Sequence, residues 1–218
     1  TELKTEYSLS ELKTAAFTST EMKTAGYTAT ELKPEYALSE LKTIGFTPAE
    51  LKTAEYTLTE LKAVNFTATN LKTDYSATEL KAEYTLSDLK TAGFTSTEVK
   101  NADFTLTELK TTGYTLSELK DASYNTVELK NEGYSASEMK TVGFGVTELI
   151  TADIELTELK TVGFTATELK TDFSLNELKT VGFSITELKA AEFTSTELKD
   201  VSFNSTELKT AGFTASEL

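Results

Sequence analysis

The chain has 218 residues, a net charge of −14 and a pI near 4.6, and 39% of its residues are hydrophobic. It contains neither cysteine nor histidine, which removes disulfides, thiolate chemistry and the commonest acid–base group and metal ligand. The acidic balance argues against nucleic-acid binding, and no apolar run reaches the roughly 18 residues that span a membrane.

One ten-residue unit repeats along residues 1–218, about 22 times. It reads Phe/Tyr, Thr/Ser, x, Thr/Ser, Glu, Leu, Lys, x, Ala/Val, Gly. A short fixed period is typical of repeat proteins, in which each unit contacts only its neighbours. We therefore predict a single repeat array. It begins within a unit, at Thr1-Glu2-Leu3-Lys4, and stops within one, at Ser216-Glu217-Leu218, so we expect an interior segment of a longer array.

Each unit, counted from its aromatic residue, carries the signals of one short helix. Position 2 is Ser, Thr or Asn except at Ala37, Gly145 and Glu155, and position 5 is Glu except at Asn70 and Asp88. Positions 2 to 5 thus form a capping box, and the aromatic residue and the Leu at position 6 have the spacing of a hydrophobic staple. Gly at position 10 is the usual helix stop. These signals predict an all-α solenoid of helices of about seven residues, one per repeat.

Along the chain, four units have nine residues instead of ten. They run from Tyr27 to Tyr36, from Phe66 to Tyr75, from Tyr75 to Tyr84 and from Phe164 to Phe173. Each lacks the Gly and has an acidic residue before the next aromatic residue. Because connections tolerate deletions best, the missing residue is predicted to lie in the turn between helices, which gives two turn types.

A β-solenoid with ten-residue coils is the alternative fold. Segments such as Thr18-Ser19-Thr20 would then form a flat row of hydroxyl groups, and Thr is a good strand residue. Against this, positions 5 to 9 are dominated by helix-forming residues. Stacked Glu on Glu and Lys on Lys would also destabilise a sheet. The helical fold is favoured.

Three rows of residues are candidates for chemistry. The Glu row could bind a cation, but a cap at the third helical residue explains its position. The Lys row, broken only at Ile150, reads as a solvated face that offsets acidic charge. The aromatic row reads as core, with Tyr hydroxyl groups at the rim. We therefore predict no catalytic, cofactor-binding or metal-binding residues, no cofactor and no enzyme activity.

The most divergent segment is 145–156. Gly145 and Val146 replace the usual residues after Phe144, Ile150 replaces Lys, and Ile154-Glu155 replaces an aromatic residue and its cap. The segment is a candidate contact site, but sequence drift is the favoured explanation.

The string Glu-Leu-Lys-x-Ala-Gly-Phe-Thr resembles the decapeptide repeat tracts of long, poorly characterised microbial and viral proteins. The resemblance implies an elongated repeat protein and no particular activity. The sequence itself favours a structural role, as a rod, fibre, spacer or scaffold that self-associates or joins a protein scaffold. The alternative role is a binding surface, for a protein partner or, on a β-solenoid, for ice through the Thr rows.

Overall fold

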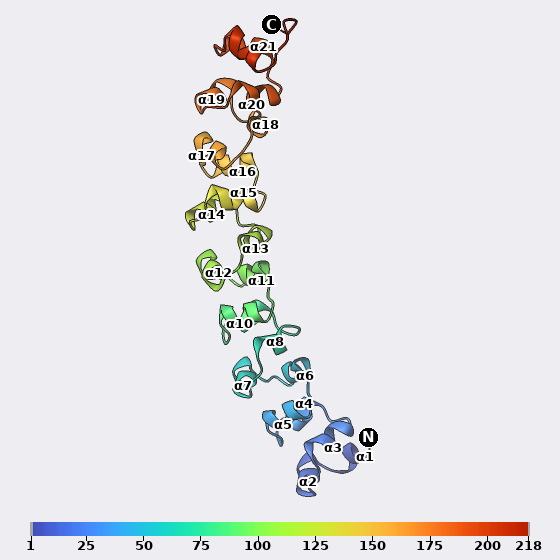
Figure 1. Cartoon of the computed structure of the whole chain (residues 1–218). Coiled ribbons are helices and arrows are strands. Elements are labelled where there is room, and N and C mark those ends of the chain that lie inside the picture. The colour runs from blue at the N-terminus through green and yellow to red at the C-terminus, as the bar shows by residue number, and fades with distance from the viewer. Residues whose placement is uncertain (1, 218) are drawn as a thin grey trace. The chain divides into compact units, whose positions relative to one another are not determined.

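A computed structural model describes residues 2–217, with side chains from residue 4 onward. Within these residues every regular element is a short helix and there is no strand (Figure 1). The predicted solenoid of very short helices, one per repeat, is confirmed. The β-solenoid alternative is not supported.

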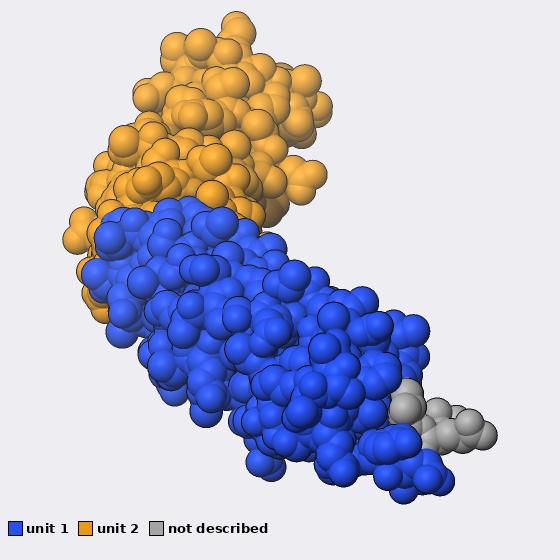
Figure 2. Space-filling view, turned by 90° about the horizontal axis from the view of Figure 1, so that it is seen from below, with its two compact units in different colours: residues 1–114 blue, residues 115–218 orange. Residues whose placement is uncertain are grey.

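Contacts divide the chain into two compact units, Thr1–Tyr114 and Thr115–Leu218, which Figure 2 colours separately. The helices of the first unit are α1 (Glu2–Glu6), α2 (Leu9–Thr14), α3 (Ser19–Thr24), α4 (Ala29–Leu32), α5 (Leu38–Thr43), α6 (Pro48–Thr53), α7 (Leu58–Ala63), α8 (Ala68–Leu71), α9 (Ala77–Leu80), α10 (Leu86–Thr91), α11 (Ser96–Asn101) and α12 (Leu106–Thr112).

The second unit continues the same pattern of one short helix per repeat. Its helices are α13 (Leu116–Asp121), α14 (Thr126–Asn131), α15 (Ala136–Thr141), α16 (Val146–Thr151), α17 (Leu156–Thr161), α18 (Ala166–Leu169), α19 (Leu175–Thr180), α20 (Ile185–Ala190), α21 (Ser195–Asp200) and α22 (Ser205–Thr210).

The capping box begins nearly every helix, as predicted. In α7 the Glu60 N–H donates to Thr57 Oγ1 at 3.2 Å, and the Thr57 N–H donates to Glu60 Oε2 at 2.7 Å. These two bonds satisfy backbone donors that have no partner inside the helix. Most helices have six residues rather than the predicted seven or so, because the chain leaves the helix at position 9.

The end of each ten-residue unit is a Schellman motif. After α3 the Gly26 N–H donates to Lys23 O at 2.9 Å, and the Tyr27 N–H donates to Met22 O at 3.0 Å. Gly26 has φ +87°, the left-handed conformation that this motif requires. Tyr27 is therefore the third residue after α3 and also the residue that precedes the Thr28 cap of α4. One aromatic residue thus ends one helix and introduces the next, which is why ten residues suffice.

The nine-residue units end differently. Their helices, α4, α8, α9 and α18, have four residues each. After α8 the Tyr75 N–H donates to Leu71 O at 2.9 Å, four residues back instead of five. No residue between Leu71 and Tyr75 has a positive φ. The prediction of two turn types is confirmed, and the deleted residue is the left-handed one.

Within each unit, most of the strongest helix contacts join helices that lie two repeats apart. The helix pairs α4–α6, α8–α10, α10–α12 and α9–α11 are in contact in the first unit, and α14–α16 and α18–α20 in the second. Because these contacts join helices two repeats apart, one turn of the solenoid contains two repeats. The Leu at position 6 forms the core: Leu51, Leu61 and Leu71 are completely buried.

Candidate functional site

Lysines connect successive turns of the solenoid. Lys42 at position 7 donates to Val64 O and to Asn65 O, both at 2.8 Å, and its Nζ lies 4.5 Å from the centroid of the Phe66 ring. Val64 and Asn65 follow α7, which lies two repeats after the α5 helix that carries Lys42. One ammonium group therefore joins a carbonyl pair and an aromatic ring of the next turn.

The same contact recurs along both units, with the ring 22–24 residues after the lysine and 4.1–5.2 Å from Nζ to centroid. We call these contacts the lysine ladder. Its pairs are Lys4–Tyr27, Lys13–Tyr36, Lys23–Phe46, Lys33–Tyr56, Lys42–Phe66, Lys52–Tyr75, Lys62–Tyr84, Lys72–Phe94, Lys81–Phe104, Lys90–Tyr114, Lys120–Phe144, Lys140–Phe164, Lys160–Phe183, Lys179–Phe203 and Lys189–Phe213.

The ladder forms because the carboxyl end of each helix attracts an ammonium group. The last carbonyl groups of a helix have no partner within it and carry partial negative charge. A lysine from the preceding turn supplies both the hydrogen bonds and the opposite charge, while the ring face adds a cation–π attraction. The prediction that the Lys row is merely a solvated face is therefore wrong: the side chains are partly exposed, but their ammonium groups bind the neighbouring turn.

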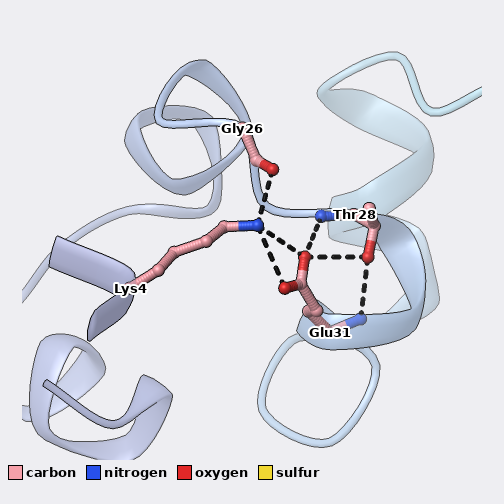
Figure 3. A network of polar contacts seen from close by, with 4 residues as sticks. All are labelled: Lys4, Gly26, Thr28 and Glu31. Carbon is pink, nitrogen blue, oxygen red and sulfur yellow. Dashed lines mark hydrogen bonds and ion pairs between the residues drawn. The ribbon is translucent and has the colours of Figure 1, made fainter. Parts of the chain in front are cut away.

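Figure 3 shows the most connected of these contacts. Lys4 Nζ donates to Gly26 O at 2.7 Å and to the Glu31 carboxylate at 2.8 and 3.0 Å. The same carboxylate accepts the Thr28 N–H at 2.7 Å. The hydrogen bond from Lys4, followed by that from the Thr28 backbone, lowers the pKa of Glu31 to about 2. Here the cap of one helix and the ladder share a single carboxylate.

Lys52 and Glu79 repeat this arrangement at 2.7 Å. The Lys52 hydrogen bond, then the Ser76 backbone N–H, lowers the pKa of Glu79 to about 2. At Glu11 the cap acts without a lysine: bonds from the Ser8 hydroxyl and backbone lower the pKa of Glu11. The prediction that the Glu row caps helices is confirmed. Among residues 2–217 no three acidic side chains are grouped so that they could hold a metal ion.

The comparisons with known proteins agree with this periodic geometry. A family model described as the decapeptide repeat region matches residues 35–106, 123–172 and 170–218. The chain belongs to the decapeptide repeat family. No curated protein and no solved structure matches it.

In this decapeptide repeat the aromatic residues line the interior, as predicted, but several Tyr hydroxyl groups do not lie at the rim. They donate to the carbonyl of the aromatic residue two repeats earlier: Tyr36 to Phe17 O at 2.7 Å, Tyr84 to Phe66 O at 2.7 Å, and Tyr114 to Phe94 O at 2.9 Å. The rim prediction is wrong for these residues. The Tyr27 and Tyr75 hydroxyls are buried without a partner.

The divergent segment of the decapeptide repeat interrupts the ladder twice. Ile150 stands where a lysine would face Phe173, and Ile154 stands where a ring would lie beneath Lys130. Lys130 nevertheless donates to Ala152 O at 2.7 Å and to Asp153 O at 3.0 Å. The hydrogen bonds from the lysine to the helix end therefore remain where the cation–π contact is lost.

No helix in the described part of the chain has the length and apolar character needed to cross a membrane. The lysine ladder was not predicted from the sequence. Its signal was present in the constant Lys at position 7 and the constant aromatic residue at position 1, but the signal could be read only once the number of repeats per turn was known.

Proposed function

We propose that this decapeptide repeat is a structural element, a spacer or scaffold whose role is to hold a periodic shape. The observation that supports this most directly is the lysine ladder. Lysine, glutamate and aromatic side chains, which carry chemistry in other proteins, are used here to join each turn to the next. The proposal includes no catalytic role, because the Glu carboxylates are engaged as cap acceptors and the Lys ammonium groups as donors to helix ends.

The charge distribution fits a structural array. The ammonium groups of the lysine ladder lie against negative helix ends, so these lysines neutralise charge within the solenoid. The remaining surface carries the excess acid that gives the net charge of −14. A net charge well away from zero opposes nonspecific association. Self-association, or attachment to a protein scaffold, would then occur through defined surfaces.

A second candidate function is a binding surface for a protein partner. Equivalent grooves lie between the rings of successive turns at Tyr84 and Phe104, at Tyr124 and Phe144, and at Phe164 and Phe183. Their volumes are about 690, 390 and 320 Å³. The lining of each groove includes a ladder lysine and a cap Glu, namely Glu108, Glu148 or Glu187. An extended peptide bearing both charges would fit this surface. The ice-binding alternative is withdrawn with the β-solenoid.

Small-angle scattering of residues 1–218 at several concentrations tests the structural role. A compact globule of this length would have a radius of gyration of roughly 17 Å. A spacer or scaffold should give a clearly larger value and an elongated pair-distance distribution. Sedimentation on the same samples then shows whether the chain self-associates. A strictly monomeric particle of globular dimensions would overturn the proposal.

A further inference from the structure

The helix α15 shows what a complete repeat contains. The Ser135 hydroxyl caps it by accepting the Glu138 N–H at 3.3 Å, and the Ser135 N–H donates to Glu138 Oε2 at 2.8 Å. At the other end, Lys140 donates to Val162 O at 3.3 Å and lies 4.1 Å from the Phe164 ring centroid. The repeat is thus connected at its own start and to the following turn.

The next helix, α16, lacks half of its cap and its lysine. Its cap residue is Gly145, which has no side chain to accept the Glu148 N–H, although the Gly145 N–H still donates to Glu148 Oε2 at 2.8 Å. Ile150 has no ammonium group for the carbonyls before Phe173. A long polar contact toward that turn joins Thr147 Oγ1 to Asp172 Oδ1 at 3.5 Å.

The connection from α16 to α17 is weakened in three further ways. Asp153 adopts the left-handed conformation with φ +52°, which is unfavourable for a residue with a Cβ atom. Ile154 gives Lys130 no ring to bind. Glu155 at the cap of α17 makes no side-chain cap bond. All of these changes fall within eleven residues, which follow the complete repeat of α15.

The apolar core of the segment is nevertheless retained. Leu149 is fully buried, and Ile154 and Val146 expose only 5% and 8% of their surface. Thr126 Oγ1 also donates to Glu148 O at 2.5 Å. The segment is therefore folded, but it depends on apolar burial where its neighbours add caps, hydrogen bonds to helix ends and cation–π contacts.

We propose that residues 145–155 form a built-in opening point, the place where the second unit unfolds locally before any neighbouring repeat does. In a solenoid each repeat is stabilised by its own bonds and by its contacts with adjacent turns. A repeat with fewer of both opens at a lower free energy while the repeats on either side remain closed. The opening point gives an otherwise uniform array one defined position at which it can unstack and close again.

Hydrogen exchange of the whole chain, resolved by peptide and corrected for intrinsic amide rates, tests this proposal. Amides in 145–155 should exchange at least about tenfold faster than those in 135–144, the adjacent complete repeat of the same unit. A repaired variant with Ile150→Lys, Ile154→Phe and Glu155→Thr should bring the two segments to within about threefold of each other. Equal protection in the unmodified chain, or unchanged exchange after the repair, would overturn the proposal.

A matched variant makes the converse change in the complete repeat. Lys140→Ile removes one ladder contact from α15 and leaves its cap and core intact. Exchange should then accelerate in 135–144 and around Phe164, while 145–155 keeps its own rate of opening. If exchange in 135–144 stays unchanged, the ladder does not control local opening and the proposal fails.

Discussion

The ten-residue repeat that contains α7 and the nine-residue repeat that contains α8 place their next aromatic ring in the same way but through different turns. In the first, Asn65 is left-handed with φ +63°, and the Phe66 N–H donates to Leu61 O at 3.0 Å, five residues back. In the second, the Tyr75 N–H donates to Leu71 O, four residues back, without a left-handed residue.

Both turns place the aromatic ring under a lysine. Lys42 Nζ lies 4.5 Å from the Phe66 centroid and Lys52 Nζ lies 4.1 Å from the Tyr75 centroid. Both leucines are fully buried. The positions of the ring, the leucine and the lysine therefore define this solenoid, whereas the length of the helix and the form of the turn are adjustable.

The largest expected effect comes from removing the shared core. Leu61→Ala and Leu71→Ala should each cost about 2–5 kcal/mol of local stability, because each leaves a cavity in a fully packed site. The losses should be similar despite the different turns. Val127→Ala is the control, since Val127 is 39% exposed, and should have little effect. Urea denaturation with local hydrogen exchange measures all three, and a much smaller loss at Leu71 would show that nine-residue repeats are packed differently.

The turns themselves should respond in opposite directions to glycine. Asp103 has φ +56°, so Asp103→Gly should stabilise its repeat by about 1 kcal/mol through relief of the left-handed conformation. Asp74, in a nine-residue repeat, has no positive φ. Asp74→Gly should therefore slightly lower the stability of that repeat, because glycine gives the unfolded chain more conformational freedom. Thermal denaturation of the two variants provides the measurement. A gain at both positions would contradict the assignment of two turn types.

Tyrosine provides a finer comparison between rings. Tyr84→Phe removes the bond to Phe66 O and should cost about 1 kcal/mol. Tyr75→Phe removes a buried hydroxyl that has no partner and should be neutral or stabilising. Chemical denaturation distinguishes these outcomes, and an equal loss at both positions would show that the Tyr75 hydroxyl is hydrogen-bonded after all.

The smallest effect concerns pH. The pKa of Glu79 is lowered to about 2 in the folded chain, below the ordinary value of about 4.3 for the unfolded chain. Its contribution to stability is therefore present above about pH 4.3 and is lost as the pH falls toward about 2. NMR titration of the Glu79 carboxyl carbon should show the low midpoint, and Lys52→Met should raise it. A midpoint that does not move in the variant would remove Lys52 as the main cause.

Much of the fold was predictable because its signals are local. The capping box at Thr57 and Glu60, the glycine stop at Gly26 and the leucine core at Leu61 all follow from short-range rules. The lysine ladder was not predictable in this way. Lys42 and Phe66 are separated by two repeats, and their meeting depends on how many repeats make one turn, which no short-range pattern determines. The lysines were consequently predicted to face the solvent, because they are charged.

Each lysine of the ladder binds the ring and the helix end of the following turn. A double-mutant cycle with Lys42→Met and Phe66→Leu tests it most directly, with the local opening free energy of the α5 and α7 repeats measured by hydrogen exchange. The ladder predicts a favourable coupling of about 0.5–1 kcal/mol between the two side chains. Strictly additive effects of the two substitutions would contradict it.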